Sequence, residues 1–321
     1  MNKKMLTSLL VVLAFTACTQ SLADTTPLPS PATATPTLYL GSPIPALDTP
    51  DTGETAVPLP LPTFTPLSQP TKPSPSGTPD EYAVILVAEE DVLNIRSGPG
   101  VENAVVGTLE STKTGITRTG RSSSVGEDLW VEIRVPGSET GWVNADFLTE
   151  YVNLATFCAD ARVKTLIENL ASAVKAKNDD ILATLIHSLH GLDARLWRYG
   201  TVANYTPEEA SWVFESEYEV DWGAAPGSGE DTLETFSEAL LPYLQEVFST
   251  NYELHCNDTL DLANFSLEPW PSEYTNINFY TVYKPGTEQY GGLDWRAWTV
   301  GIEYVEGVPY LFSLIHYQWE P

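Results

Sequence analysis

The sequence predicts a multidomain protein in which a small all-β barrel is followed by an α+β domain and preceded by a disordered Pro/Thr-rich linker. Of the 25 prolines, 15 lie in residues 24–80, whereas residues 81–150 are short β-type runs separated by Gly, Pro, Ser and Asp. From residue 151 onward, helical spacing comes first and the alternation of an antiparallel sheet comes last, as in α+β domains. We call residues 81–150 the β domain and residues 151–321 the acidic domain.

The first residues carry an export signal. Lys3 and Lys4 precede an apolar run, Leu9–Phe15, that is too short to span a bilayer, and small residues lead into Cys18. Residues 1–17 resemble a bacterial lipoprotein signal peptide, and this resemblance implies cleavage before Cys18 and lipidation of that cysteine. The alternative is a plain secretory signal that is cut nearby. We therefore expect a protein of the bacterial cell envelope that is lipid-anchored to the membrane and faces outside.

Residues 18–80 are predicted to be the lipidated cysteine and a disordered tether. From Asp24 to Asp80 the sequence is mostly Pro, Thr, Ser and Ala with few regularly spaced apolar residues. Such a segment buries too little surface to offset chain entropy. In polyproline form, at about 3.1 Å per residue, it reaches on the order of 170 Å.

The β domain contains a recognisable series of short motifs. "LNIRSGPG" at residues 93–100 is followed by "VVGTL", then "LWVEI", then "TGWVNADFL". Together they resemble the bacterial SH3-like domain, and the resemblance covers residues 81–150. It implies a module that binds cell-wall peptides or spaces other domains. Residues 120–129, "GRSSSVGEDL", form a longer loop than the family usually has.

The glycines of "SGPG" invite comparison with a phosphate-binding loop. Such a loop feeds a helix N-terminus, whose free N–H groups bind the anion, and no helical pattern follows Gly100. We therefore interpret residues 98–100 as a turn, in which the proline fixes φ and the glycines accept positive φ. Arg96 is expected to point outward beside the turn. The expected core residues of the domain are Leu93, Ile95, Val106 and Trp130.

The acidic domain opens with capped helices. Asp160 is a good N-cap for a first helix, and Asp179 or Asp180 for a second whose apolar residues run to residue 189. In "TPEEASWVF", Thr206 and Glu209 predict a capping box around an N-terminal proline.

Apolar residues at helical spacing continue over a longer stretch in "TLETFSEALLPYLQEVF". This stretch predicts one helix over residues 233–247 with a kink at Pro242. The sequence pattern then changes to the two-residue period of β-strands in "INFYTVY", "RAWTVGIEYV" and "VPYLFSLIHYQW". Glu306 and Gly307 predict a tight hairpin between the last two of these runs. Both faces of these strands are apolar, so both need covering. This order of elements is loosely similar to the nuclear-transport-factor-2-like cone fold.

The remaining cysteines form an even pair in an exported domain. Oxidising conditions favour a disulfide between Cys158, on the first helix, and Cys256, on the strand after the kinked helix. The alternative makes Cys158 a nucleophile with His255 or His187 as its base, as in the cysteine peptidases that often accompany SH3-like modules. Those enzymes place the cysteine in an Asp-Cys-Ser-Gly-like elbow, whereas this chain has "FCAD".

Two further patterns are candidate metal ligands, although we predict no metal site. His187 and His190 are three residues apart and would share one helix face, with Asp193 or a glutamate as an additional ligand. "FESEYEVDW" read as a strand places carboxylates on one face, which is either a solvated outer face or a Ca²⁺ site. The carboxylates are Glu215, Glu217, Glu219 and Asp221.

Charge and aromatic content limit the classes of molecule that the protein is expected to bind. The net charge of −27 argues against nucleic acid and anionic surfaces as partners, and the acidic domain has 26 Asp and Glu against 8 Lys and Arg. Aromatic side chains near carboxylates line sugar and cation sites, but they also form ordinary cores. The candidate ligand-binding residues are Trp270, Tyr274, Asp294, Trp295 and Arg296.

These observations predict a lipid-anchored, non-catalytic binding or sensing protein of the cell envelope. Its predicted partner is a cell-wall peptide, a glycan or an envelope protein, with no nucleic acid, no cofactor and membrane contact through the lipid alone. The alternative is a cell-wall or polysaccharide hydrolase whose site lies in the acidic domain, with two carboxylates or the region of His187 and Asp193 as acid and base.

Overall fold

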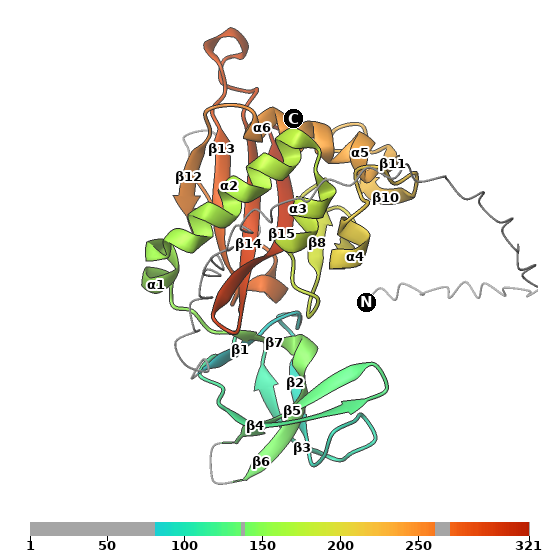
Figure 1. Cartoon of the computed structure of the whole chain (residues 1–321), viewed down its shortest axis with the longest axis vertical. Coiled ribbons are helices and arrows are strands. Elements are labelled where there is room, and N and C mark those ends of the chain that lie inside the picture. The colour runs from blue at the N-terminus through green and yellow to red at the C-terminus, as the bar shows by residue number, and fades with distance from the viewer. Residues whose placement is uncertain (1–80, 136–138, 261–269, 321) are drawn as a thin grey trace, which may run out of the picture. The chain divides into compact units, whose positions relative to one another are not determined.

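The computed structural model describes residues 81–135, 139–260 and 270–320 (Figure 1). All of these residues lie in one compact unit. The predicted signal peptide, Cys18 and the predicted tether lie outside the described residues. Within the described ranges, no helix has both the length and the apolar character needed to cross a membrane.

The described part of the β domain is built from strands and one short 3₁₀ helix. The elements are β1 (Tyr82–Val84), β2 (Val92–Arg96), β3 (Val105–Glu110), β4 (Arg118–Val125), β5 (Asp128–Arg134), β6 (Thr140–Asn144), η1 (Ala145–Phe147) and β7 (Leu148–Glu150). Five strands form an antiparallel sheet in the order β3-β2-β6-β5-β4, and β1 pairs with β7. The predicted all-β character of this segment is confirmed.

The main core of the β domain is drawn from residues between Tyr82 and Leu148. Leu93 and Ile95 on β2 are buried, and so is Trp130 on β5, as the sequence predicts. Val106 is 54% exposed, so its prediction as a core residue is wrong. The reason is that β3 is an edge strand.

The predicted long loop over residues 120–129 is also wrong. This segment is most of a β-hairpin, in which β4 and β5 pair down to Val125 opposite Asp128. Gly126 takes a φ of 65° in the two-residue turn between them. The sequence pattern does not reveal this hairpin, because β4 is a largely exposed edge strand made mostly of serine, glycine and arginine.

The glycine turn at residues 98–100 is held by side chains of its own loop. The Arg96 guanidinium donates to the carbonyls of Val101, at 2.6 Å, and Asn103, at 2.9 Å. Arg96 therefore closes the loop and does not simply point outward. Gly100 has a φ of 110°, and the chain continues into β3, so the loop precedes a strand and not a helix.

The acidic domain is built around a six-stranded sheet. Its strands are β8 (Leu192–Arg195), β9 (Ala203–Tyr205), β12 (Glu253–Cys256), β13 (Asn278–Lys284), β14 (Arg296–Val305) and β15 (Val308–Gln318). Their order is β12-β13-β14-β15-β8-β9, with only the β15–β8 pair parallel. Two more strands, β10 (Glu219–Ala224) and β11 (Asp231–Thr235), form a separate hairpin. Glu306 and Gly307 make the predicted tight turn, with φ values of 51° and 72°.

Short helices precede and interrupt the strands. They are α1 (Leu154–Ala159), α2 (Ala161–Ala176), α3 (Asp179–Thr184), α4 (Pro207–Ala210), α5 (Phe236–Ala239), α6 (Leu241–Phe248), and the 3₁₀ turns η2 (Ser272–Tyr274) and η3 (Glu288–Tyr290). Asp160 caps α2, and Thr206 with Glu209 forms a capping box at α4, as predicted.

Two predicted helices differ from the structure. α3 is capped by Asn178 and ends at Thr184, because the chain then leaves the helix to form a parallel bridge between Ile186 and Leu311 of β15. The predicted helix over residues 233–247 is a strand, β11, followed by two helices. Pairing with β10 keeps the chain extended up to Thr235, which caps α5.

Both faces of the six-stranded sheet are covered. In Figure 1, α2 crosses the face formed by β13, β14 and β15. The core on the helical side includes Trp298, Val300 and Leu314, packed with α2 and α6. The core on the opposite face contains Phe312 and Ile315. A register shift between β14 and β15 at Gly301 changes which side chains face each core.

His316 lies inside the helical-side core. It is 1% exposed and packs against the rings of Trp197, Tyr243 and Trp298. Its Nδ1 lies 3.1 Å from the carbonyl of Leu196, so this nitrogen carries the proton of the neutral ring. Burial lowers the pKa of His316 to about 3.

We predict that His316 makes the protein acid-sensitive. Its pKa is about 3 in the folded chain and 6.5 in the ordinary state, so its stabilising contribution is complete above pH 6.5 and is lost as pH falls toward 3. At about 1.4 kcal/mol per pKa unit, the loss reaches roughly 4–5 kcal/mol. Denaturant unfolding of wild type and His316→Gln across this range measures it. Equal pH slopes for the two proteins, or an imidazole NMR resonance that titrates near pH 6.5, would contradict the assignment.

The structure joins Cys158 of α1 to Cys256 of β12 by a disulfide, with the Cα atoms 5.8 Å apart. We predict that reduction lowers the free energy of unfolding, because the bond closes a loop with a sequence separation of 98. In the chain-entropy model a loop of this size contributes up to about 4.7 kcal/mol. Urea unfolding with and without reductant measures the difference, with Cys158→Ala/Cys256→Ala as the control that reductant leaves unchanged. Two free thiols in unreduced, natively purified protein would disprove the bond.

We also predict that Gly100 is the position of the glycine turn at which a side chain would strain the backbone most. Gly100→Val should lower the free energy of unfolding by about 1–3 kcal/mol, because a β-branched residue resists positive φ. Gly98 has no positive φ, and an added Cβ there meets only the Asn103 side chain, at 2.8 Å. Gly98→Val should therefore cost less. Urea unfolding of both variants tests the order, and a larger loss at Gly98 would contradict it.

Candidate functional site

The aromatic residues proposed from the sequence as ligand contacts belong to a core. Tyr274 and Trp295 are 1% and 3% exposed and lie with partly buried Trp270 in the core on the face opposite the helices. Trp270 stacks on Phe279 with ring centroids 4.3 Å apart, and its indole N–H donates to the Tyr274 carbonyl at 2.9 Å. The fold therefore brings these three residues together, but they pack in a hydrophobic core.

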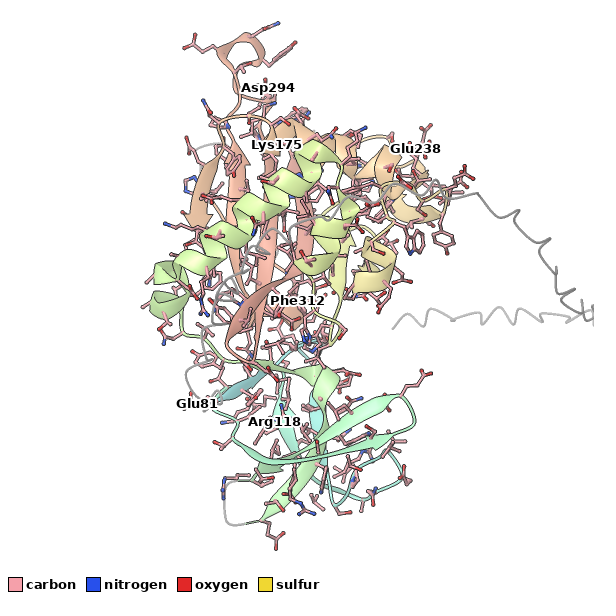
Figure 2. All side chains as sticks on the ribbon, in the orientation of Figure 1. Glu81, Arg118, Lys175, Glu238, Asp294 and Phe312 are labelled. Carbon is pink, nitrogen blue, oxygen red and sulfur yellow. A yellow bond between two sulfur atoms is a disulfide. The ribbon has the colours of Figure 1, made fainter. Side chains whose placement is uncertain are left out.

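The two polar residues proposed with them lie elsewhere and act locally. Asp294 accepts hydrogen bonds from the backbone N–H and the hydroxyl of Thr287, at 2.6 and 2.9 Å, and so closes the β13–β14 connection. Figure 2 shows Asp294 at that connection, away from Phe312 in the middle of β15. Arg296 forms an ion pair with Glu246 on α6, with Nε and Oε2 3.4 Å apart.

The histidine pair is separated by its backbone. His187 and His190 lie in the turn after α3, not on one helix face. His187 Nδ1 accepts the backbone N–H of Leu189 at 3.0 Å, while His190 Nδ1 pairs with the Glu303 carboxylate on β14. In the described ranges, no group of three or more His, Cys, Asp or Glu side chains is placed to hold a metal ion.

The carboxylate series is only partly a strand. Glu215 lies in a turn and Glu217 in an irregular segment, whereas Glu219 and Asp221 lie on β10. The Asp221 carboxylate accepts the backbone N–H of Gly223 at 2.9 Å. The predicted strand therefore begins later than expected, and the series does not form one continuous face.

The β domain and the acidic domain are joined by specific hydrogen bonds. Buried Glu150 of β7 accepts the backbone N–H groups of Glu306 and Gly307, at 2.6 and 2.9 Å. Burial is the main influence on this carboxyl and raises its pKa, against the two N–H groups that oppose the shift. The Asn276 amide also donates to the carbonyl of Val84 at 2.7 Å.

A cavity of about 220 Å³ lies beside this junction. Its lining includes Thr149 of β7 with His190 and Glu303 of the acidic domain. The side chains of His190 and Glu303 are 2% and 0% exposed. His190 Nε2, Glu303 Oε1 and Thr149 Oγ1 are buried and have no hydrogen-bond partner among the described residues. We call this space the junction cavity. Three unsatisfied buried polar atoms mark a place for water or a polar ligand.

A second cavity, of about 250 Å³, lies wholly within the acidic domain. Its buried lining residues are Val213 and Phe236, and its aromatic lining is completed by Tyr205, Trp212 and Tyr218. The remaining lining residues are Val202, Ala203, Asn204, Glu209, Ser216 and Val220. We call it the acidic aromatic pocket.

Sequence reasoning missed the acidic aromatic pocket, although two signals were available. Trp212 follows the capping box of Thr206 and Glu209, and Tyr218 lies inside the carboxylate series of residues 215–221. What the sequence did not provide was the pairing of β10 with β11, which places Phe236 beneath these residues.

Searches of curated proteins and of solved structures find no match to this chain. One family model does match, over residues 91–149, and its description is Bacterial SH3 domain. The matched range runs from the residue before β2 into β7 and therefore covers the five-stranded sheet. The β domain thus contains a bacterial SH3 domain.

Proposed function

We propose that this chain is a lipid-anchored binding protein of the bacterial cell envelope, whose SH3 domain binds a cell-wall peptide or an envelope protein. The observation that carries the proposal is the bacterial SH3 domain at residues 91–149, because such domains serve as modules for wall or protein binding. The signal-like residues 1–17 and the proline-rich segment after Cys18 support export and anchoring.

The edge of the SH3 sheet offers a binding surface. Val101, Val105 and Val106 are 69%, 51% and 54% exposed, and the latter two lie at the start of edge strand β3. Edge strands present unpaired backbone groups to an incoming peptide, and adjacent exposed apolar side chains add surface to bury. We call these three residues the valine patch and assign the partner contact to it.

The test is cosedimentation of the protein with purified cell walls. Val105→Thr/Val106→Thr keeps the β-branched shape but makes the patch polar, so binding should weaken about 5- to 10-fold. Val92→Thr is the matched control, because Val92 is 38% exposed on β2 outside the patch. Equal wall binding by wild type and the double variant would remove the patch from the proposal. Failure of wild type to bind either walls or envelope proteins would remove the function.

Anchoring is tested separately. Cys18→Ala should release the protein from membranes and leave an unprocessed precursor, because the lipid would be attached to that cysteine. Membrane fractionation and the mass of the mature N-terminus are the measurements. A variant that is processed and located like wild type would contradict lipid anchoring and leave the SH3 binding role to be judged on the wall assay.

A second candidate function, hydrolysis of wall or polysaccharide, is favoured by the junction cavity. A carboxylate paired with an imidazole, such as Glu303 with His190, is the arrangement that orients a general base. His190 lines the cavity, and its Nε2 has no hydrogen-bond partner among the described residues. Release of soluble fragments from walls or glycans, lost in His190→Gln, would support this function. Saturable binding without products supports the binding protein instead.

A further inference from the structure

The acidic aromatic pocket is lined in part by exposed aromatic rings. Trp212 is 49% exposed and Tyr218 is 73% exposed, whereas Trp222 and Trp298 are fully buried. Single exposed apolar side chains are common on protein surfaces. Here, however, the exposed rings line one cavity together with buried Phe236, and such a grouping marks a surface that a partner covers.

The segment that lines the pocket, residues 202–236, carries charge of one sign in its sequence. No lysine or arginine occurs between Arg198 and Lys284, and residues 201–240 contain ten carboxylates. None of these ten takes part in a salt bridge among the described residues. Glu209 lines the pocket itself. The chain therefore leaves a negative field that a cation would complement. The ten are Glu208, Glu209, Glu215, Glu217, Glu219, Asp221, Glu230, Asp231, Glu234 and Glu238.

The pocket also contains an unsatisfied polar atom. The Tyr205 hydroxyl is buried and has no hydrogen-bond partner among the described residues, while its ring packs edge-on against Phe236 at 5.4 Å. Burial, followed by the charge of Glu209 and by Tyr218, raises the pKa of Tyr205, so the hydroxyl stays neutral. Its oxygen can accept a hydrogen bond from a ligand N–H.

Size and hydrogen bonding distinguish a cation from a sugar. The cavity, at about 250 Å³, is below the roughly 300–1,000 Å³ of pockets that enclose whole small molecules, so it suits a side chain or a head group. A sugar needs several free donors and acceptors. Asn204 Nδ2 already donates to the His190 carbonyl and to Asp193 Oδ1, and Ser216 Oγ accepts the Tyr218 N–H.

We propose that the acidic aromatic pocket binds an alkylammonium group, such as the side chain of a lysyl residue or the end of a polyamine. The alkyl stem lies on Val213 and Phe236, the charged nitrogen meets the faces of Trp212 and Tyr218, and the Tyr205 hydroxyl accepts one N–H. This site goes beyond the SH3-based function, because it lies wholly in the acidic domain.

The first experiment measures binding to the purified full chain by calorimetry and by Trp fluorescence. The probes are N-acetyl-lysine methylamide, spermidine, tetramethylammonium, glucose and the neutral isostere N-acetyl-norleucine methylamide. Both amines should bind, with an affinity that falls as salt rises, and the neutral isostere and glucose should bind at least tenfold more weakly. Stronger binding of the peptide-like amine identifies a lysyl source, and stronger binding of spermidine identifies a polyamine.

The structure supplies a matched pair of charge variants. Glu209 and Glu238 each close a capping box with a threonine, but only Glu209 lines the pocket; Figure 2 labels Glu238 on α5. Glutamine keeps a capping box and removes the charge. Glu209→Gln should therefore weaken amine binding, and Glu238→Gln should leave the affinity at the wild-type value. Both variants should have equal melting temperatures.

Two ring variants locate the cation. Trp212→Ala should weaken amine binding roughly 2- to 30-fold, the range expected for loss of a cation–π contact, and Trp319→Ala is the control at another exposed tryptophan. Tyr205→Phe should weaken primary amines but not tetramethylammonium, which has no N–H to donate.

The proposal fails if the neutral isostere or glucose binds as well as the amines, or if no amine binds at millimolar concentration. It also fails if Glu209→Gln and Glu238→Gln behave alike. If Trp212→Ala does not fold, the glutamine pair and Tyr205→Phe decide the question, because all three substitutions keep the local structure. The wall assay on the valine patch is independent of all these results.

Discussion

The six-stranded sheet of the acidic domain is apolar on both faces, and this constraint organises most of the described structure. Eight of the ten residues of β14 and eight of the eleven residues of β15 are buried. Because successive side chains of a strand point to opposite faces, such continuous burial means that both faces of the sheet are covered. Helices α2 and α6 cover one face. The other face is closed by the segment from Trp270 to Ile277 and by Ile85, which is 1% exposed although it belongs to the β domain. The hydrogen bonds of Glu150 and Asn276 accompany this contact, so the same part of the β domain both attaches to the acidic domain and helps to bury the second face of its sheet.

How far the sequence predicted this arrangement depends on the range of the interactions involved. Capping residues act over a few positions, and Asp160 and the Thr206–Glu209 box were identified from sequence alone. The final hairpin was identified because alternation and a two-residue turn are also local. The SH3 fold was found through its motifs, and the Cys158–Cys256 bond through cysteine count and compartment. The predictions for Cys18 and the tether remain predictions.

The errors come from contacts between distant residues. "TLETF" has helical spacing, but pairing with β10 extends it, and α3 stops short because Ile186 bridges to Leu311. Long-range packing also decides where the candidate ligand residues lie: Tyr274 and Trp295 fill the second face of the sheet, which composition alone does not reveal. Conversely, Trp212 and Tyr218 look like further aromatics of an ordinary core until the structure shows them exposed around a cavity.

The distribution of charge separates the two cavities by chemistry. At the junction cavity, two buried carboxylates have partners: one oxygen of Glu303 pairs with His190, and Glu150 accepts two backbone N–H groups. The ten carboxylates of residues 201–240 form no salt bridge in the part of the chain that the structure describes, and residues 199–283 contain no lysine or arginine. Unpaired like charges raise the free energy of the folded state unless they are solvated or meet a cation. Turns and irregular segments separate some of these carboxylates from one another, and this separation reduces their mutual repulsion. It does not remove the negative charge of the segment. The negative potential is therefore a standing property of the acidic domain, available to any positively charged group that fits between the rings.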